Sequence, residues 1–130
     1  MDLSVVAPAF DEAPVLPRFI ERTLALLDGF GGTCELIIVD DGSTDETWAA
    51  ISAAAVTDPR IRGVRLARNF GHQLALTAGL AAADGDHVVT LDADLQHPPE
   101  LIPDLLAAAE RGWDVVYAVR GPDDSASLLK

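Results

Sequence analysis

Asp92 and Asp94 offer the clearest chemistry in this sequence, two carboxylates with one residue between them. They follow residues 88–91, an apolar, β-branched run that is typical of a buried strand. Pro98 and Pro99 come next and suit the start of a helix, where a missing backbone N–H costs little. The carboxylates are therefore predicted just past the carboxyl end of a strand, where open α/β sheets bind ligands.

Two carboxylates spaced i, i+2 point to the same side of an extended or turning backbone. Held close together, they repel each other unless they are protonated or bridged by a cation. Oxygen ligands of this kind suit Mg²⁺ or Mn²⁺, and a bound diphosphate would complete the coordination shell. The alternative is a solvated acidic turn with Asp94 near a helix N-terminus, and Asp-x-Asp alone does not decide between them. The segment that follows, residues 96–100, favours the metal site.

Length and composition predict one globular domain over residues 1–130, with 49% hydrophobic residues. The net charge of −12 argues against a nucleic-acid partner, and it means that an anionic phosphate ligand needs a cation to mediate. Cys34 is the only cysteine, so no disulfide can form within the chain. No apolar run approaches the roughly 20 residues that span a bilayer, and no signal peptide is recognisable, which predicts a soluble, cytoplasmic chain.

Apolar periodicity alternates between strand and helix along the whole chain. Strands are expected at residues 3–7, 35–39, 61–66, 88–91 and 114–119, and helices at 13–27, from 43 or 44 to before Pro59, 74–83 and 100–111. This alternation predicts an α/β fold, with a mainly parallel sheet and helices on both faces. Polar loops follow all five strands, and in a parallel sheet they would meet at one edge.

Four segments resemble the family 2 glycosyltransferases of GT-A fold, and within them the dolichyl- or undecaprenyl-phosphate sugar transferases. The segments are residues 3–12, 37–45, 68–71 and 92–100. The last is the most specific, because Asp-Ala-Asp-Leu-Gln-x-Pro-Pro-Glu marks this subgroup. The resemblance implies a Rossmann-like, nucleotide-sugar-binding fold, of which this chain is the donor-binding part, truncated after the fifth strand.

The resemblance also implies residue roles, by position. Asp92 and Asp94 would be catalytic and, with Gln96, would hold a divalent metal, Mg²⁺ or Mn²⁺. The nucleotide-sugar would be bound by Pro8, Phe10, Glu12, Val39, Asp41, Ala93 and Arg120. Among these, Phe10 would lie against the base or ribose, Asp41 would accept a hydrogen bond from the base, and Arg120 would lie near the phosphates.

The implied reaction transfers a hexose from a UDP- or GDP-linked sugar to a polyprenyl phosphate, with inversion, at the cytoplasmic face of the membrane. Rival classes are a truncated, inactive nucleotide-diphosphate-binding module, a nucleotidyltransferase and a receiver-like signalling domain. A nucleotidyltransferase would usually have a Gly-rich phosphate loop after the first strand, and this sequence has none there. A receiver domain would need an Asp after the third strand and a Lys after the fifth, and neither stands at those places.

Several site residues also have structural interpretations. Asp40 and Asp41 could form a turn and cap, with Asp41 the more functional of the two. Glu12 could be a first-turn charge that interacts favourably with the dipole of the helix that follows, and Phe10 could be a core residue. His97 would be an exposed loop residue, and the sequence suggests no partner for His72 or His87.

Overall fold

The computed structural model describes residues 1–120 and 126–129, with side chains described through residue 116. The chain divides into two compact units, Met1–Pro99 and Glu100–Lys130. The first unit contains the strands and helices that position the candidate site.

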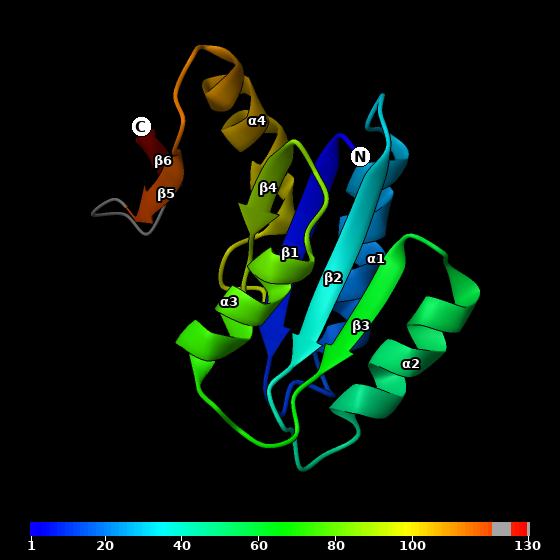
Figure 1. Ribbon diagram of the computed structural model, residues 1–130. Coiled ribbons are helices and arrows are strands. Elements are labelled where there is room, and N and C mark those ends of the chain that lie inside the picture. Colours follow the sequence, from blue (N-terminus) through cyan, green and yellow to red (C-terminus); the bar gives the residue numbers. More distant parts are fainter. Residues whose placement is uncertain (121–125, 130) are drawn as a thin grey trace. The chain divides into compact units, whose positions relative to one another are not determined.

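A four-stranded parallel sheet forms the centre of the first unit (Figure 1). Its strands are β1 (Leu3–Ala9), β2 (Cys34–Asp40), β3 (Ile61–Arg65) and β4 (His87–Thr90), in the spatial order β3-β2-β1-β4. Every residue of β1 is buried, as expected for a central strand covered on both faces. The predicted α/β class and parallel sheet are thus confirmed.

Helices cover both faces of this sheet. The helices are α1 (Leu16–Asp28), α2 (Thr47–Thr57) and α3 (His72–Ala82), and in Figure 1 α3 lies in front of the sheet and α1 behind it. Gly79 lets α3 approach closely, because a Cβ there would overlap Val6 of β1 and press on Val39 of β2. On the opposite face, Gly63 of β3 lies against the side chains of α2.

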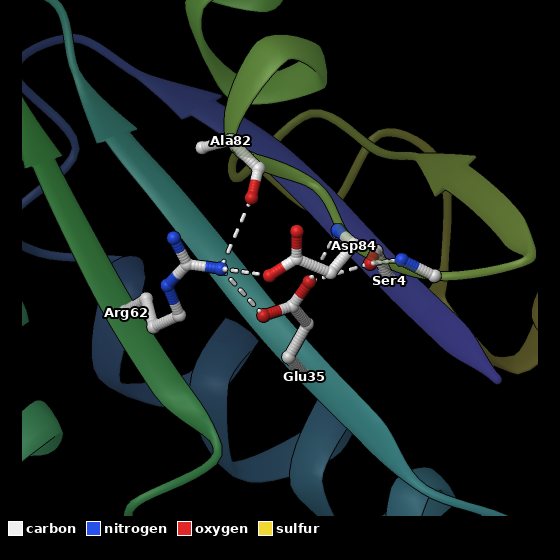
Figure 2. A network of polar contacts seen from close by, with 6 residues as sticks. Ser4, Glu35, Arg62, Ala82 and Asp84 are labelled. Carbon is white, nitrogen blue, oxygen red and sulfur yellow. Dashed lines mark hydrogen bonds and ion pairs between the residues drawn. The ribbon is translucent and has the colours of Figure 1, made fainter. Parts of the chain in front are cut away.

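A buried carboxylate ties three strands to the segment between α3 and β4 (Figure 2). Glu35 is 3% exposed and accepts hydrogen bonds from the Ser4 hydroxyl at 2.6 Å and the Asp84 backbone N–H at 3.0 Å. Its other oxygen lies 2.8 Å from Nη1 of Arg62 on β3, which also donates to the carbonyl of Ala82 at 3.0 Å. This network sits at the amino ends of the strands, opposite the predicted ligand edge.

A short 3₁₀ turn (Pro99–Leu101) spans the boundary between the units and leads into α4 (Ile102–Glu110) of the second unit. The second unit also holds two strands, β5 (Tyr117–Arg120) and β6 (Ala126–Leu129). The sequence predicted a fifth strand in the parallel sheet, and this prediction is wrong. Strand β5 pairs with β6 instead and runs antiparallel to it. Residues 126–129, unassigned from the sequence, form β6. The fifth polar loop, residues 120–124, lies almost entirely outside the described residues.

Smaller differences concern element ends. Residues 88–91 are not a fully buried strand: β4 occupies an edge of the four-stranded sheet, and Val88 is 42% exposed. Helix α1 begins at Leu16 rather than residue 13, and the N–H of Ala13 before it donates to the carboxylate of Asp45. Among the described residues, no helix is long and apolar enough to cross a bilayer.

Candidate functional site

A cleft of about 420 Å³ lies at the carboxyl-end edge of the four-stranded sheet. Its size is within the usual range for small-molecule sites. Residues from the ends of all four strands or the loops that follow them line it: Pro8, Ala9, Phe10, Glu12, Asp41, Asn69, Gly71, His72, Asp92, Ala93 and Asp94. The predicted convergence of strand-end loops is therefore found for four loops.

Most of the predicted site residues line this cleft, whereas two of those with described side chains, Val39 and Gln96, do not. Val39 is fully buried beneath α3. Gln96 is exposed outside the lining, and its backbone N–H donates to Asp94 Oδ1 at 3.0 Å. The side chain of Arg120 lies outside the described part of the structure. The roles predicted for these three residues, like those predicted for the residues that line the cleft, stay predictions.

Asp92, Ala93 and Asp94 are consecutive residues of the loop after β4, and all three line the cleft. Ala93 is 1% exposed, whereas the two aspartates are half-buried in the cleft wall. The loop is fixed at its start by Leu91, whose N–H donates to the carbonyl of Val6 at 3.0 Å. Leu95 has a positive φ of 65°, which turns the chain immediately after Asp94. Both aspartates therefore line one cleft, as expected, and their role as metal ligands stays a prediction.

His72 is a cleft residue that sequence reasoning missed. Its Nε2 lies 2.9 Å from Oδ1 of Asp92. The two residues are 20 positions apart and come from the start of α3 and the loop after β4. A polar residue right after the Asn-Phe-Gly segment, at a strand-end loop, was the available signal, but the sequence did not indicate its partner.

Asp41 is buried at 3% exposure and holds the loop between β3 and α3. Its Oδ1 accepts a hydrogen bond from the N–H of Phe70 at 2.8 Å. Its Oδ2 accepts from the N–H of Gly71 at 3.1 Å and from Nδ2 of Asn69 at 3.2 Å. Asp41 thus lines the cleft and also organises its wall, which combines the structural and functional interpretations.

Asp40, its neighbour, is entirely a structural residue in this geometry. It is fully buried, and its Oδ1 accepts from the N–H of Ser43 at 3.0 Å. Its Oδ2 lies 3.9 Å from Nε of Arg65. Asp40 does not line the cleft, whereas Asp41 does, and the functional role expected of Asp41 stays a prediction.

The loop after β1 is tied to the loop after β2 by side-chain hydrogen bonds. The N–H of Asp11 donates to the Ser43 hydroxyl at 2.9 Å, and the Asp11 carboxylate accepts from the N–H of Thr44 at 2.7 Å. The N–H of Glu12 donates to the Thr47 hydroxyl at 3.0 Å. These contacts fix the backbone from which Phe10, 43% exposed, and Glu12 reach the cleft.

The cleft is electrostatically negative. Partial burial raises the pKa of Glu12, and the charges of Asp94, Asp45 and Asp92 raise it further. Within the described residues, no three or more His, Cys, Asp or Glu side chains are grouped to hold a metal by themselves. Two carboxylates in a negative cleft suit a divalent cation whose remaining ligands come from a bound diphosphate.

The family model described as Glycosyl transferase family 2 matches residues 4–128. A Shewanella sediminis protein named undecaprenyl-phosphate 4-deoxy-4-formamido-L-arabinose transferase is 46% identical over 129 residues, 98% of this chain. A Proteus mirabilis protein of the same name is 47% identical over 115 residues, 88% of this chain. The chain spans 39% and 35% of these relatives' lengths, respectively.

Solved structures of sugar transferases share the fold. Mannosyltransferase PcManGT from Pyrobaculum calidifontis, in complex with GDP-Man and Mn²⁺, superposes with a TM-score of 0.73 at 28% identity, covering 94% of this chain and 36% of that one. Glucosyl-3-phosphoglycerate synthase from Mycobacterium tuberculosis, in complex with Mn²⁺, UDP and glucosyl-3-phosphoglycerate, gives 0.67 at 34% identity, covering 83% and 39%. The expected GT-A-like fold is thereby confirmed. Because the family model covers nearly the whole chain and the curated relatives share almost half of its aligned residues, this chain belongs to glycosyl transferase family 2.

Proposed function

We propose that this chain is the nucleotide-sugar-binding part of a glycosyltransferase that transfers a glycosyl unit to a polyprenyl phosphate. The donor would be a UDP- or GDP-linked sugar, bound with Mg²⁺ or Mn²⁺, and transfer would invert the anomeric carbon. A glycosyl unit replaces the hexose expected above, because the two bacterial relatives are named for a 4-deoxy-4-formamido-L-arabinose.

One observation carries the proposal: Asp92 and Asp94 stand together in a cleft formed by the loops at the strand ends. Diphosphate binding in such a negative cleft requires a cation, and the neighbours crystallised with Mn²⁺ and a nucleotide or nucleotide-sugar have the same fold. The acceptor part rests on the names of the relatives, which are undecaprenyl-phosphate transferases. A polyprenyl phosphate lies in a membrane, so we place the reaction at the cytoplasmic membrane face.

The chain's own groups would act mainly by positioning. Asp92 and Asp94 would hold the cation, and the exposed ring of Phe10 offers a flat apolar surface for the base. A bound Mg²⁺ or Mn²⁺ supplies Lewis-acid stabilisation to the leaving diphosphate. The acceptor phosphate is already a nucleophile, which removes the need for a strong general base.

Calorimetric titration with UDP and GDP, each with and without Mn²⁺, tests the donor site. We expect one nucleotide to bind in a Mn²⁺-dependent manner, and Asp92→Asn and Asp94→Asn each to abolish that dependence, because a neutral amide is a much poorer metal ligand. Asp86→Asn is the matched control, since Asp86 is exposed and does not line the cleft.

Circular dichroism of all variants checks that the fold is retained. Unchanged Mn²⁺-dependent affinity in both Asp92→Asn and Asp94→Asn would refute the metal assignment. Failure of the folded wild-type chain to bind either nucleotide would refute the donor site itself.

A further inference from the structure

The contact between His72 and Asp92 joins two cleft residues from different elements. Nε2 of His72 lies 2.9 Å from Oδ1 of Asp92, and their side chains are 57% and 36% exposed, respectively. A carboxylate only accepts hydrogen bonds, so the contact is a hydrogen bond when the proton is on Nε2. The interaction is therefore directional and fixes one oxygen of Asp92.

The fold anchors both partners of this contact. On one side, Asp41 accepts hydrogen bonds from the N–H groups of Phe70 and Gly71, directly before His72. Gly71 has a φ of 99°, which favours glycine and sets the direction in which α3 begins. On the other side, the N–H of Leu91 is bonded to β1 directly before Asp92. His72 and Asp92 are thus held facing each other by their backbones.

The carboxylates of Asp92 and Asp94 each have one oxygen held by a polar contact. Oδ1 of Asp92 faces His72, and Oδ1 of Asp94 accepts from the N–H of Gln96 at 3.0 Å. Each carboxylate thus has one oxygen engaged and, among the described interactions, a second oxygen with no hydrogen bond. Partners that engage one oxygen of a metal-binding carboxylate restrict its rotation and typically influence metal affinity 10–100-fold.

We propose that His72 is a positioning residue that holds Asp92 so that its second oxygen faces the divalent cation of the donor complex. The inference rests on the proposed function, because it takes Asp92 to be a metal ligand. It assigns His72 no contact with the nucleotide or the sugar. Its energetic contribution should therefore appear only when the metal is present.

The test compares three variants at one fixed pH. His72→Ala removes the hydrogen bond, whereas His72→Gln keeps an N–H donor at a similar distance from the backbone. His87→Ala is the matched control, because His87 is an exposed histidine at the amino end of β4, away from the cleft. Calorimetry measures the affinity of each variant for the nucleotide that the wild-type chain binds, UDP or GDP, with Mn²⁺ and with EDTA. Electron paramagnetic resonance of Mn²⁺ follows the metal directly in the same mixtures.

For His72→Ala we expect affinity in Mn²⁺ to fall about 10-fold, the lower end of the range for such partners because the pair is half-exposed. Affinity in EDTA should not change, and the spectrum of bound Mn²⁺ should differ from that of wild type. His72→Gln should recover most of the loss, and His87→Ala should behave as wild type.

Three outcomes would overturn the inference while leaving the proposed function standing. The first is unchanged Mn²⁺-dependent affinity in His72→Ala alongside loss in Asp92→Asn. The second is an equal loss with Mn²⁺ and with EDTA, which would indicate direct contact with the nucleotide. The third is a His72→Gln variant as weak as His72→Ala. Absence of Mn²⁺-dependent binding in the wild-type chain would overturn both proposals.

Discussion

Asp41 shows how a single side chain can serve the cleft and the fold at once. The Asp41 carboxylate accepts three hydrogen bonds, one each from Asn69, Phe70 and Gly71, which lie about 30 positions further along the chain. Two are backbone N–H groups, and a buried N–H without an acceptor is costly. Any contact that Asp41 makes to a nucleotide base would therefore be made by a carboxylate whose orientation is already fixed.

Asp41→Asn should destabilise the chain by about 1–3 kcal/mol. Whichever way the amide is turned, its NH₂ group faces an N–H donor, because both carboxylate oxygens accept from backbone groups. Urea unfolding of the variant measures the change, with Asp86→Asn as the exposed control. An Asp41→Asn variant as stable as wild type would show that the loop re-forms its hydrogen bonds elsewhere.

At the scale of elements, the loops at the strand ends support one another. The loop after β2 contacts the loop after β1 through Ser43 and the loop after β3 through Gly42. Gly42 has a φ of 68°, and a Cβ at this position would overlap the backbone at Arg68 and Asn69. Glycine is required here both by the turn and by the close approach of the neighbouring loop.

Gly42→Ala should lower the free energy of unfolding by more than about 2 kcal/mol. The left-handed conformation alone costs an alanine roughly 1–2 kcal/mol, and the backbone overlap adds to it. Gly31→Ala is the matched control, because a Cβ at Gly31 has no neighbour within 4 Å. The two variants are compared by urea unfolding, and equal stabilities would contradict the assignment of the loop contact.

At the scale of the whole first unit, the cleft lies at the carboxyl ends of the strands and the Glu35 network lies at their amino ends. Desolvation opposes ionisation of Glu35, but hydrogen bonds from Ser4, Asp84 and Arg62, with the Arg62 charge, lower its pKa below the ordinary value. The network joins segments that are up to 81 positions apart, including the Gly85 N–H bonded to the Ser4 hydroxyl. It therefore helps to hold β1, β2 and β3 together with the segment that leads into β4.

The lowered pKa of Glu35 gives a pH dependence with a definite sign. The unfolded chain takes up the proton first as pH falls, so the stability from this group is full well above pH 4.5 and is lost on acidification through the lower, folded pKa. Glu35→Gln should be about 1–3 kcal/mol less stable than wild type at pH 7, and the gap should narrow toward pH 3. Urea unfolding between pH 7 and pH 3 measures it.

Glu21→Gln is the control for this series, because Glu21 is exposed on α1. A gap between wild type and Glu35→Gln that stayed constant with pH would contradict the proposed ionised state of Glu35.

The sequence by itself determined the element order in the first unit, the parallel sheet and the edge at which polar loops gather. These follow from local apolar periodicity and from the geometry of parallel strands, which places every strand end at one edge. The placement of Asp92 and Asp94 at the strand-end cleft also followed, because they come just after an apolar run that forms a strand.

Only the tertiary structure decided which groups meet across that edge. His72 faces Asp92, and Asp41 holds residues 69–71, because loops separated by 20 to 30 positions adopt complementary backbone conformations. The partner of β5 was likewise undetermined, since a short β-branched run favours a strand but does not specify its neighbour. Long-range hydrogen bonds depend on the conformations of two loops at once, and residue types within each loop do not specify that pairing.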